Sequence, residues 1–254
     1  MKKFRLIFVW MIIFPGLMCA QHYLTGGVGF SLSFLESEDL KNFTSTYNQV
    51  NEPGLEKYLN GLTGDAAGLA FAFGFRYISK WTISFEIGRD EIIKKDAARF
   101  GIGEERHLTL KLQSNTVTLG VGRTFGKMFL QGVATYHFAR RVTLKSSYTR
   151  LSGEPPKKSL TGTYRSSDNT STDLGVEIGV LRKPFILVGK ISYPLHTGGR
   201  KDYLRSFDTI KIENQTDLFP GDFWEYVDQT HYRGVGSDID GLKVMITLLL
   251  SFSI

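Results

Sequence analysis

The stretch GLKVMITLLLSFSI at residues 241–254 decides the fold, because an apolar residue stands at every second position through to its end. A period of two predicts a β-strand with two distinct faces. One face would be wholly apolar, and the other would carry Lys243, Thr247, Ser251 and Ser253 together with Met245 and Leu249. A strand of this length and polarity suits the lipid-facing wall of a closed barrel, although a soluble β-sandwich could also use it.

The same alternation recurs along the chain and predicts eight strands in all. The expected strands are 23–34, 66–78, 81–90, 107–125, 128–148, 172–181, 185–195 and 241–254. Most of them reach the about 9–11 residues that a tilted strand needs to cross a bilayer. In the fourth, the apolar residues change from even to odd positions near Ser114 and Asn115, which predicts a β-bulge there.

Short and long connections alternate between these strands. Two or three residues join the second strand to the third, the fourth to the fifth and the sixth to the seventh, whereas the links near 35–66, 91–106, 149–172 and 196–240 are long. All short turns would then lie at one end, as in membrane barrels with short periplasmic turns and longer extracellular loops. An even strand number lets the last strand pair with the first, which removes both sheet edges. We therefore expect an all-β, eight-stranded, antiparallel up-and-down transmembrane barrel.

The first residues have the features of a secretory signal peptide. Lys2, Lys3 and Arg5 precede an apolar run, and the small residue Ala20 suits cleavage. The sequence thus predicts a removed segment at 1–20 and a single barrel domain at 21–254, the alternative being a retained N-terminal anchor. The only cysteine, Cys19, would be removed, so that no disulfide or thiolate metal site is expected.

The charge balance gives no sign of a nucleic-acid partner. Removing the three basic residues of the signal peptide reduces 31 Lys and Arg to 28, against 25 Asp and Glu. No basic stripe with interleaved aromatic residues, as nucleic-acid binding requires, is present.

The pattern resembles the small eight-stranded outer-membrane barrels of the OmpA/OmpX type, as found in Bacteroidota, over residues 21–254. The junction of Ala20 and Gln21 is similar to signal peptides of that group. The resemblance implies a place in the outer membrane of a Gram-negative bacterium, with outer-membrane lipid and the barrel assembly machinery as partners. Such barrels usually end on an aromatic residue that this machinery reads. Here Phe252 stands two residues before Ile254, so 241–254 is expected both to close the barrel and to direct its insertion.

Charged residues on the expected inward faces form a candidate lumen network. An eight-stranded interior is just wide enough for side chains to fill. Buried carboxylates such as Glu86 and Glu177 would be costly unless paired. The network would either line an ion path or plug the barrel with salt bridges, and we expect the plug. Its predicted members are Arg76, Glu86, Lys111, His137, Arg141, Glu177, Lys190 and Lys243.

His137 raises the question of an enzyme. Some eight-stranded barrels modify lipid A, which requires a histidine with a serine and an acid in hydrogen-bonding reach. Ser84 and Glu177 lie on expected inward faces, but no nucleophile elbow is present. The sequence therefore favours a protein that is not an enzyme, and no cofactor is expected.

The long connections are candidates for interaction. The last one, 196–240, alternates aromatic and acidic residues, which indicates a surface for an extracellular protein or glycan. Alternatively, this loop buries its aromatic residues over the barrel mouth. The spacing of its acids does not match a calcium loop, and no metal site is predicted. Short helices are expected near 37–47 and 53–62. The candidate binding residues are Phe219, Asp222, Phe223, Trp224, Glu225 and Tyr226.

The sequence thus predicts an outer-membrane barrel with a structural or surface-interaction role. The alternatives are a narrow, porin-like pore for small solutes, a lipid A-modifying enzyme and a soluble β-protein. Aromatic residues beside the three short turns are expected to form a girdle at the membrane interface. These are Tyr77, Trp81, Phe125, Phe129 and Phe185.

Overall fold

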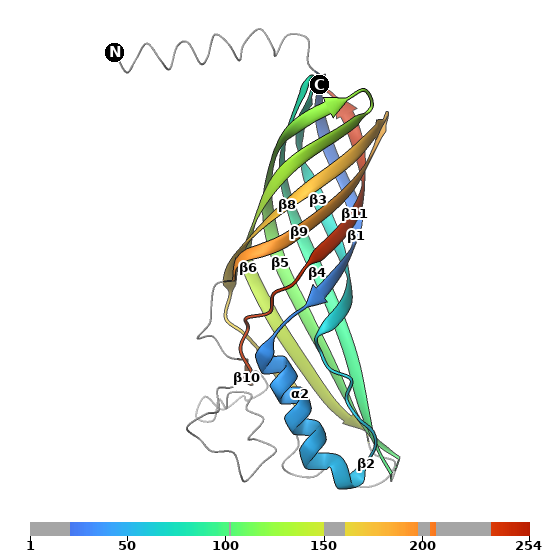
Figure 1. Ribbon diagram of the computed structural model, residues 1–254, viewed down its shortest axis with the longest axis vertical. Helices are drawn as coiled ribbons and strands as arrows, with labels where there is room; N and C mark the ends of the chain where they lie inside the picture. Colours follow the sequence, from blue (N-terminus) through green and yellow to red (C-terminus); the bar gives the residue numbers. More distant parts are fainter. Residues whose placement is uncertain (1–20, 102, 150–160, 198–203, 207–234) are drawn as a thin grey trace, which may run out of the picture.

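Eight long strands form a closed ring in the computed structural model (Figure 1). The structure describes residues 21–101, 103–149, 161–197, 204–206 and 235–254. The predicted signal peptide at 1–20 and the binding residues between 219 and 226 lie outside these ranges. The eight strands are β1 (Gln21–Leu35), β3 (Gly64–Ile78), β4 (Trp81–Phe100), β5 (Glu104–Phe125), β6 (Met128–Thr149), β8 (Asn169–Arg182), β9 (Phe185–Thr197) and β11 (Lys243–Ser253).

Each strand of the ring pairs antiparallel with the next one along the chain. The ring closes between β1 and β11, whose register runs from Tyr23 opposite Ser253 to Ser33 opposite Lys243. Closure gives every strand a partner on both sides, so the ring has no free edge. The structure confirms the predicted up-and-down barrel of eight strands.

The two ends of the barrel differ. The tight turns between β3 and β4, β5 and β6, and β8 and β9 lie at one end together with the C-terminus, which we call the turn end (Figure 1). At the opposite, loop end, β4, β5 and β6 run on past the other strands. Three short strands extend the sheet there: β2 (Leu55–Lys57) pairs with β4, β7 (Gly162–Arg165) with β6, and β10 (Arg205–Ser206) with β7.

One helix, α2 (Glu38–Asn51), packs at the loop end. Ser37 caps its N-terminus by accepting a hydrogen bond from the backbone N–H of Leu40 at 3.3 Å. The helix predicted near 37–47 is confirmed and runs four residues further. The one predicted near 53–62 is wrong, because Pro53 lies in the short 3₁₀ helix η1 (Glu52–Gly54), which leads directly into β2. Within the described ranges, no helix is long and apolar enough to span a membrane.

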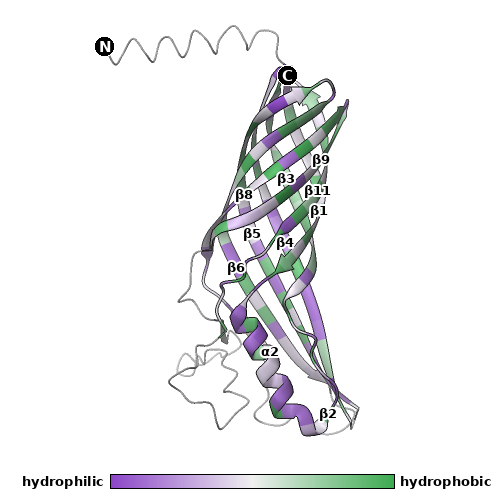
Figure 2. Ribbon diagram, viewed as in Figure 1, coloured by the Kyte–Doolittle hydropathy of each residue, from purple (hydrophilic) through white to green (hydrophobic). Residues whose placement is uncertain are grey.

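The polarity of the two barrel faces reverses between the turn end and the loop end. On β4 the outward residues are apolar as far as Ile87 and mostly polar from Arg89 onward, with Ile93 as an exposed apolar exception. The inward residues do the opposite, since Glu86 and Asp90 give way to Ile92 and Ala98. Figure 2 shows how hydrophilic and hydrophobic residues alternate along the strands.

Strands β5 and β6 reach this reversal in different ways. Even-numbered residues of β5 face inward along its whole length, so Leu112 and Ser114 lie on the same face. The predicted bulge at Ser114 and Asn115 is therefore wrong for β5. The extra residue lies in the partner strand, because Gln113 is opposite Arg141 and Asn115 is opposite Phe138.

The bulge in β6 centres on Ala139, whose φ of 49° lies in the left-handed region. Inward residues are odd-numbered up to His137 and even-numbered from Arg140 onward. An extra residue shifts the pleat by one, which turns the following side chains to the opposite face. Apolar residues thus stay at even positions of β6 while the face that they occupy changes.

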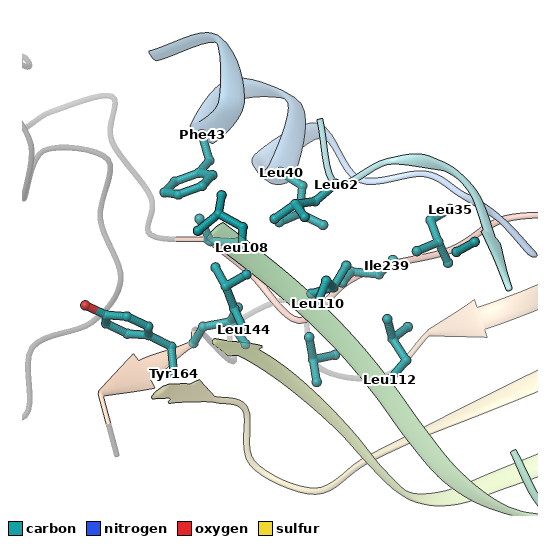
Figure 3. Close-up of a cluster of buried hydrophobic side chains, with 14 of the residues drawn as sticks. Leu35, Leu40, Phe43, Leu62, Leu108, Leu110, Leu112, Leu144, Tyr164 and Ile239 are labelled. Atoms are coloured by element: carbon teal, nitrogen blue, oxygen red, sulfur yellow. The ribbon is translucent and has the colours of Figure 1, made fainter. Parts of the chain in front are cut away.

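The inward apolar residues of the loop end form a core with α2. Leu40 and Phe43 of the helix point toward Leu108 and Leu144 of the sheet, and Leu62 covers the same cluster (Figure 3). All five side chains are fully buried. We call this cluster the loop-end core. Further members are Leu35, Tyr47, Leu59, Ile92, Leu110, Leu112, Val142, Tyr164, Leu204, Val235 and Ile239.

Replacing Phe43 by alanine should release α2 without opening the barrel. The lost contacts and the residual cavity are worth about 3–5 kcal/mol, which is comparable to what a single short helix gains by docking. Limited proteolysis should cut within 38–51 in this variant faster than in the wild type. Ser45→Ala, an exposed position on the same helix, should behave as the wild type. Equal cleavage of the Phe43 and Ser45 variants would contradict this role of the loop-end core.

Candidate functional site: the charged interior

The barrel interior is filled by layers of side chains between the two ends. Nearest the turn end is an apolar layer, which we call the turn-end plug and which is at most 7% exposed. The short turns bring together residues from five different strands here. The turn-end plug consists of Tyr23, Ile78, Phe129, Ile186, Val188 and Leu249.

Next to this plug lies the arginine cluster, formed by Arg76, Glu86, Gln131 and Glu177. The Arg76 guanidinium pairs with Glu86 through Nη2 and lies 2.7 Å from Glu177 through Nη1. Gln131 donates to Glu177 at 2.7 Å and to Ser84 at 2.9 Å. Arg76 is fully buried and stands 5.0 Å from the centre of the Phe129 ring. One arginine thus holds two carboxylates inside a protein interior, where an unpaired charge is strongly unfavourable.

Next to the arginine cluster, on the side of the loop end, lies the histidine cluster. It contains Asp90, Ser114, His137, Asp173 and Lys243. The Ser114 hydroxyl is 2.9 Å from His137 Nδ1, and His137 Nε2 is 2.9 Å from Asp173 Oδ2. Lys243 donates to Asp90. All five side chains are less than a tenth exposed.

Lys190 connects the two clusters. It stands opposite Glu177 in the ladder of β8 and β9. Its ammonium group donates to Thr135 at 3.4 Å. Charged side chains from several strands therefore fill this part of the barrel interior.

A cavity of about 70 Å³ separates the histidine cluster from the loop-end core. Ser114, His137, Asp173, Asp90 and Lys243 border it on one side. Apolar residues of the loop-end core border it on the other: Leu35, Ile92, Leu112 and Ile239. The cavity thus combines titratable groups with an apolar wall, which is the usual character of a small-molecule site.

The structure places six of the eight predicted network residues in the interior. These are Arg76, Glu86, His137, Glu177, Lys190 and Lys243.

The other two predicted network residues, Lys111 and Arg141, lie on the outer face of the loop end, and their assignment was wrong. Lys111 is 2.8 Å from Glu91, and its hydrogen bond lowers the pKa of that carboxyl group. Arg141 is 2.7 Å from Asp168. Both errors follow from the reversal of face polarity, because the outward positions of β5 and β6 at the loop end carry polar residues.

Several site residues were missed. Asp90 continues the even-numbered inward positions of Glu86, and Asp173 precedes Glu177 by four residues on the inward face, so both could have been found from alternation. Ser114 was hidden by the bulge assigned to β5. Ser84 and Glu177, proposed as partners of His137, instead bond to Gln131.

Of the predicted interfacial aromatic residues, Phe129 points into the turn-end plug, where it is 1% exposed. Trp81, Phe125 and Phe185 are exposed on the outer face at the turn end, as expected for a girdle. Within the described ranges, no group of three or more His, Cys, Asp or Glu side chains is arranged to hold a metal ion.

These features define a closed antiparallel β-barrel with an apolar outer wall and a charged, filled interior. Two solved structures are similar to this chain over most of its length. Ail, the attachment invasion locus protein of Yersinia pestis, solved with the heparin analogue sucrose octasulfate, is 9% identical with a TM-score of 0.40, covering 92% of this chain and 99% of Ail. The outer membrane protease OmpT from Escherichia coli is 11% identical with a TM-score of 0.40, covering 92% of this chain and 96% of OmpT. No protein-family model and no curated protein matches the chain.

Replacing Arg76 by methionine should destabilise the barrel by about 3–5 kcal/mol, because Glu86 and Glu177 would keep their buried charges without a partner. Unfolding in urea, followed by the mobility of heated and unheated protein on gels, measures this loss. The triple variant Arg76→Met, Glu86→Gln, Glu177→Gln removes the charges together and should recover most of it. A triple variant as unstable as the single one would show that Arg76 acts through packing on Phe129 instead.

Proposed function

We propose that this protein is an outer-membrane barrel of a Gram-negative bacterium with a structural or surface-interaction role, placed there after export with a cleaved signal peptide. The observation that carries the proposal is the belt of apolar side chains around the outer wall. Soluble monomers rarely expose a continuous apolar patch of more than a few hundred Å². Side chains of this belt exposed by more than 40% include Val28, Phe30, Leu69, Phe71, Phe73, Ile83, Phe85, Ile87, Leu119, Val121, Leu130, Leu174, Val176, Ile178, Leu187, Ile191, Ile246 and Leu248.

The belt has a defined edge toward the loop end. Ile87 is opposite Val117, and one step further Arg89 is opposite Asn115. Toward the turn end it finishes at Trp81 and Phe125, whose exposed rings suit the headgroup level. A belt that is apolar between two polar or aromatic borders matches a bilayer-spanning wall. The loop end would then face the outside.

The filled interior argues against the alternative of a narrow pore. The turn-end plug and the loop-end core close both ends of the charged network among the described residues. A solute would have to displace side chains that are almost fully buried. The role is thus assigned to the surfaces of the barrel. In this proposal β11 closes the ring and its outward Phe252 is read by the assembly machinery.

The long connection 196–240 is the proposed contact surface for an extracellular protein or glycan. Its residues between Phe219 and Tyr226 alternate aromatic and acidic side chains in the sequence. Aromatic side chains of this kind dominate the energetics of many interfaces.

An arginine within the belt should impair membrane insertion. Leu119→Arg places a charge against the lipid chains at a cost of about 2–4 kcal/mol. His107→Arg, on the outward face of the same strand β5 but beyond the belt, should have little effect. The measurement is the fraction of chain in the outer membrane that shows a heat-dependent shift on gels. If both variants insert equally well, or if the wild type is soluble without detergent, the membrane proposal is wrong.

The contact surface is tested on cells. Bacteria that display the protein should adhere to an array of immobilised matrix proteins and glycans more than cells with an empty vector. The double variant Phe223→Ser, Trp224→Ser should reduce this adhesion at least about tenfold, as expected when two interface anchors are lost. If cells with the protein adhere no better than cells with the empty vector, the proposed contact surface is wrong and only the structural role remains.

A further inference from the structure

Ser114, His137 and Asp173 form a continuous hydrogen-bonded chain across three strands. The residues come from β5, β6 and β8, where Ser114 and Asp173 each lie two residues from the residue directly opposite His137 on their strand. Both hydrogen bonds of the imidazole measure 2.9 Å. A hydroxyl, an imidazole and a carboxylate in this order are the arrangement that activates a serine as a nucleophile, and it is recognised by geometry and not by sequence order.

The chain also fixes the tautomer of the imidazole. An ionised Asp173 can only accept a hydrogen bond, so the proton that it shares with His137 must lie on Nε2. In the neutral ring Nδ1 is then an acceptor, and the Ser114 hydroxyl donates to it. His137 is thus held in the state that a general base requires, with Asp173 orienting the ring.

The chain borders the cavity of about 70 Å³, which has room beside Ser114 for an ester group and the first carbons of its acyl chain. Lys243 and Arg140 border the same cavity, and both are buried. Lys243 donates to Asp90, and Arg140 donates to the backbone carbonyls of Ser237 and Ile239. The oxyanion that develops when a hydroxyl attacks a carbonyl group would be stabilised by their remaining N–H groups. The apolar wall formed by the loop-end core suits an acyl chain.

The barrel wall is interrupted beside this cavity. The ladder between β9 and β11 ends where Ser192 stands opposite Lys243, although β9 runs on to Thr197. Pro194, two residues past this last pair, has no N–H to donate, and Gly241 on the facing segment has a φ of 132°. Both residues line the cavity. The wall is therefore not held by ladder hydrogen bonds at the point where it separates the cavity from the outside.

The outer surface around this interruption is apolar. Tyr193, Leu195 and Leu242 flank it and are 53%, 65% and 38% exposed. A molecule that reaches the cavity through the wall would cross this apolar surface first. The substrate that fits both features is amphipathic, with an acyl chain on the apolar side and a polar group near the histidine cluster.

We propose that Ser114, His137 and Asp173 form a hydrolytic site for the carboxylic ester of an amphipathic, acyl-bearing molecule. The Ser114 oxygen attacks the ester carbonyl while its proton passes to His137 Nδ1. The tetrahedral intermediate collapses, the ester C–O bond breaks, and the leaving alcohol takes the proton from His137. Water then attacks the acyl-serine, gives a proton to His137 and releases the carboxylic acid, after which the proton returns to Ser114. Asp173 is a positioning residue that stabilises the imidazolium.

The experiment uses the full chain purified from membranes in detergent micelles. A fluorophosphonate probe with an alkyl chain should phosphonylate Ser114 with loss of fluoride, and peptide mass spectrometry locates the adduct. p-Nitrophenyl decanoate should be hydrolysed, with p-nitrophenyl butyrate a poorer substrate because its chain reaches less of the apolar wall.

The variants separate catalysis from folding. Ser114→Ala should abolish labelling and hydrolysis. His137→Gln should lower hydrolysis at least about 100-fold, the contribution of a positioned general base. Asp173→Asn should lower kcat with little change in KM, since it acts through the imidazole. Ser84→Ala removes a buried serine that bonds only to Gln131 and should keep full activity. Each variant is compared by its heat-dependent gel shift, which reports the folded barrel.

Two results would overturn the proposal. One is a folded wild type that neither reacts with the probe nor hydrolyses the ester above the level of Ser114→Ala. The other is an adduct on a different serine with Ser114→Ala still active. Neither result bears on the outer-membrane proposal, which depends on insertion and on the Leu119 and His107 variants.

Discussion

The closed ladder of hydrogen bonds is the constraint on which the rest of the molecule depends. Once β1 pairs with β11, every strand has one face inside and one outside, and no backbone edge is left to be satisfied. Side chains of the outer face must suit their surroundings at each height, and those of the inner face must fill a space too narrow for water to dominate. The arginine and histidine clusters follow directly, because charges that occupy this space must find partners within it.

Two neighbouring strands solve the reversal of face polarity in different ways. On β5 the sequence itself changes, so that leucines replace serine and threonine at even positions while the backbone pleat continues. On β6 the sequence keeps its apolar residues at even positions, and the bulge at Ala139 turns them inward. Because these strands are paired, both changes occur at the same height, next to Ser114 and His137. The reversal thus places a serine and a histidine at the boundary between the charged interior and the loop-end core.

The alternation of apolar residues predicted the eight strands, their order and the closure. It ended the third strand at residue 90 and assigned 91–106 to a long connection, which is wrong, because β4 runs to Phe100 and β5 begins at Glu104. Inside the apolar belt it also placed Arg76, Glu86 and Glu177 correctly on the inner face. It failed for Lys111 and Arg141, because a sequence period does not say which face meets water once the strand leaves the belt. The partners of His137 could not be predicted either. Their meeting depends on the relative stagger of β5, β6 and β8, which the register fixes and the sequence of any one strand does not contain.

The bulge at Ala139 determines which side chains face inward in the following part of β6. If β6 followed a regular pleat through Ala139 with no bulge, Val142 and Leu144 would turn toward water, while Arg141 and Lys145 would turn into the leucine-rich interior. The side-chain orientations at the turn end and at the loop end are therefore linked by the number of residues in β6 and not by direct contacts. An insertion or deletion in the long connections would leave both parts intact. Deletion of Ala139 would remove the bulge and keep the following side chains on their present faces, whereas one residue inserted into the regular pleat beyond the bulge would exchange the inside and the outside of the rest of the strand.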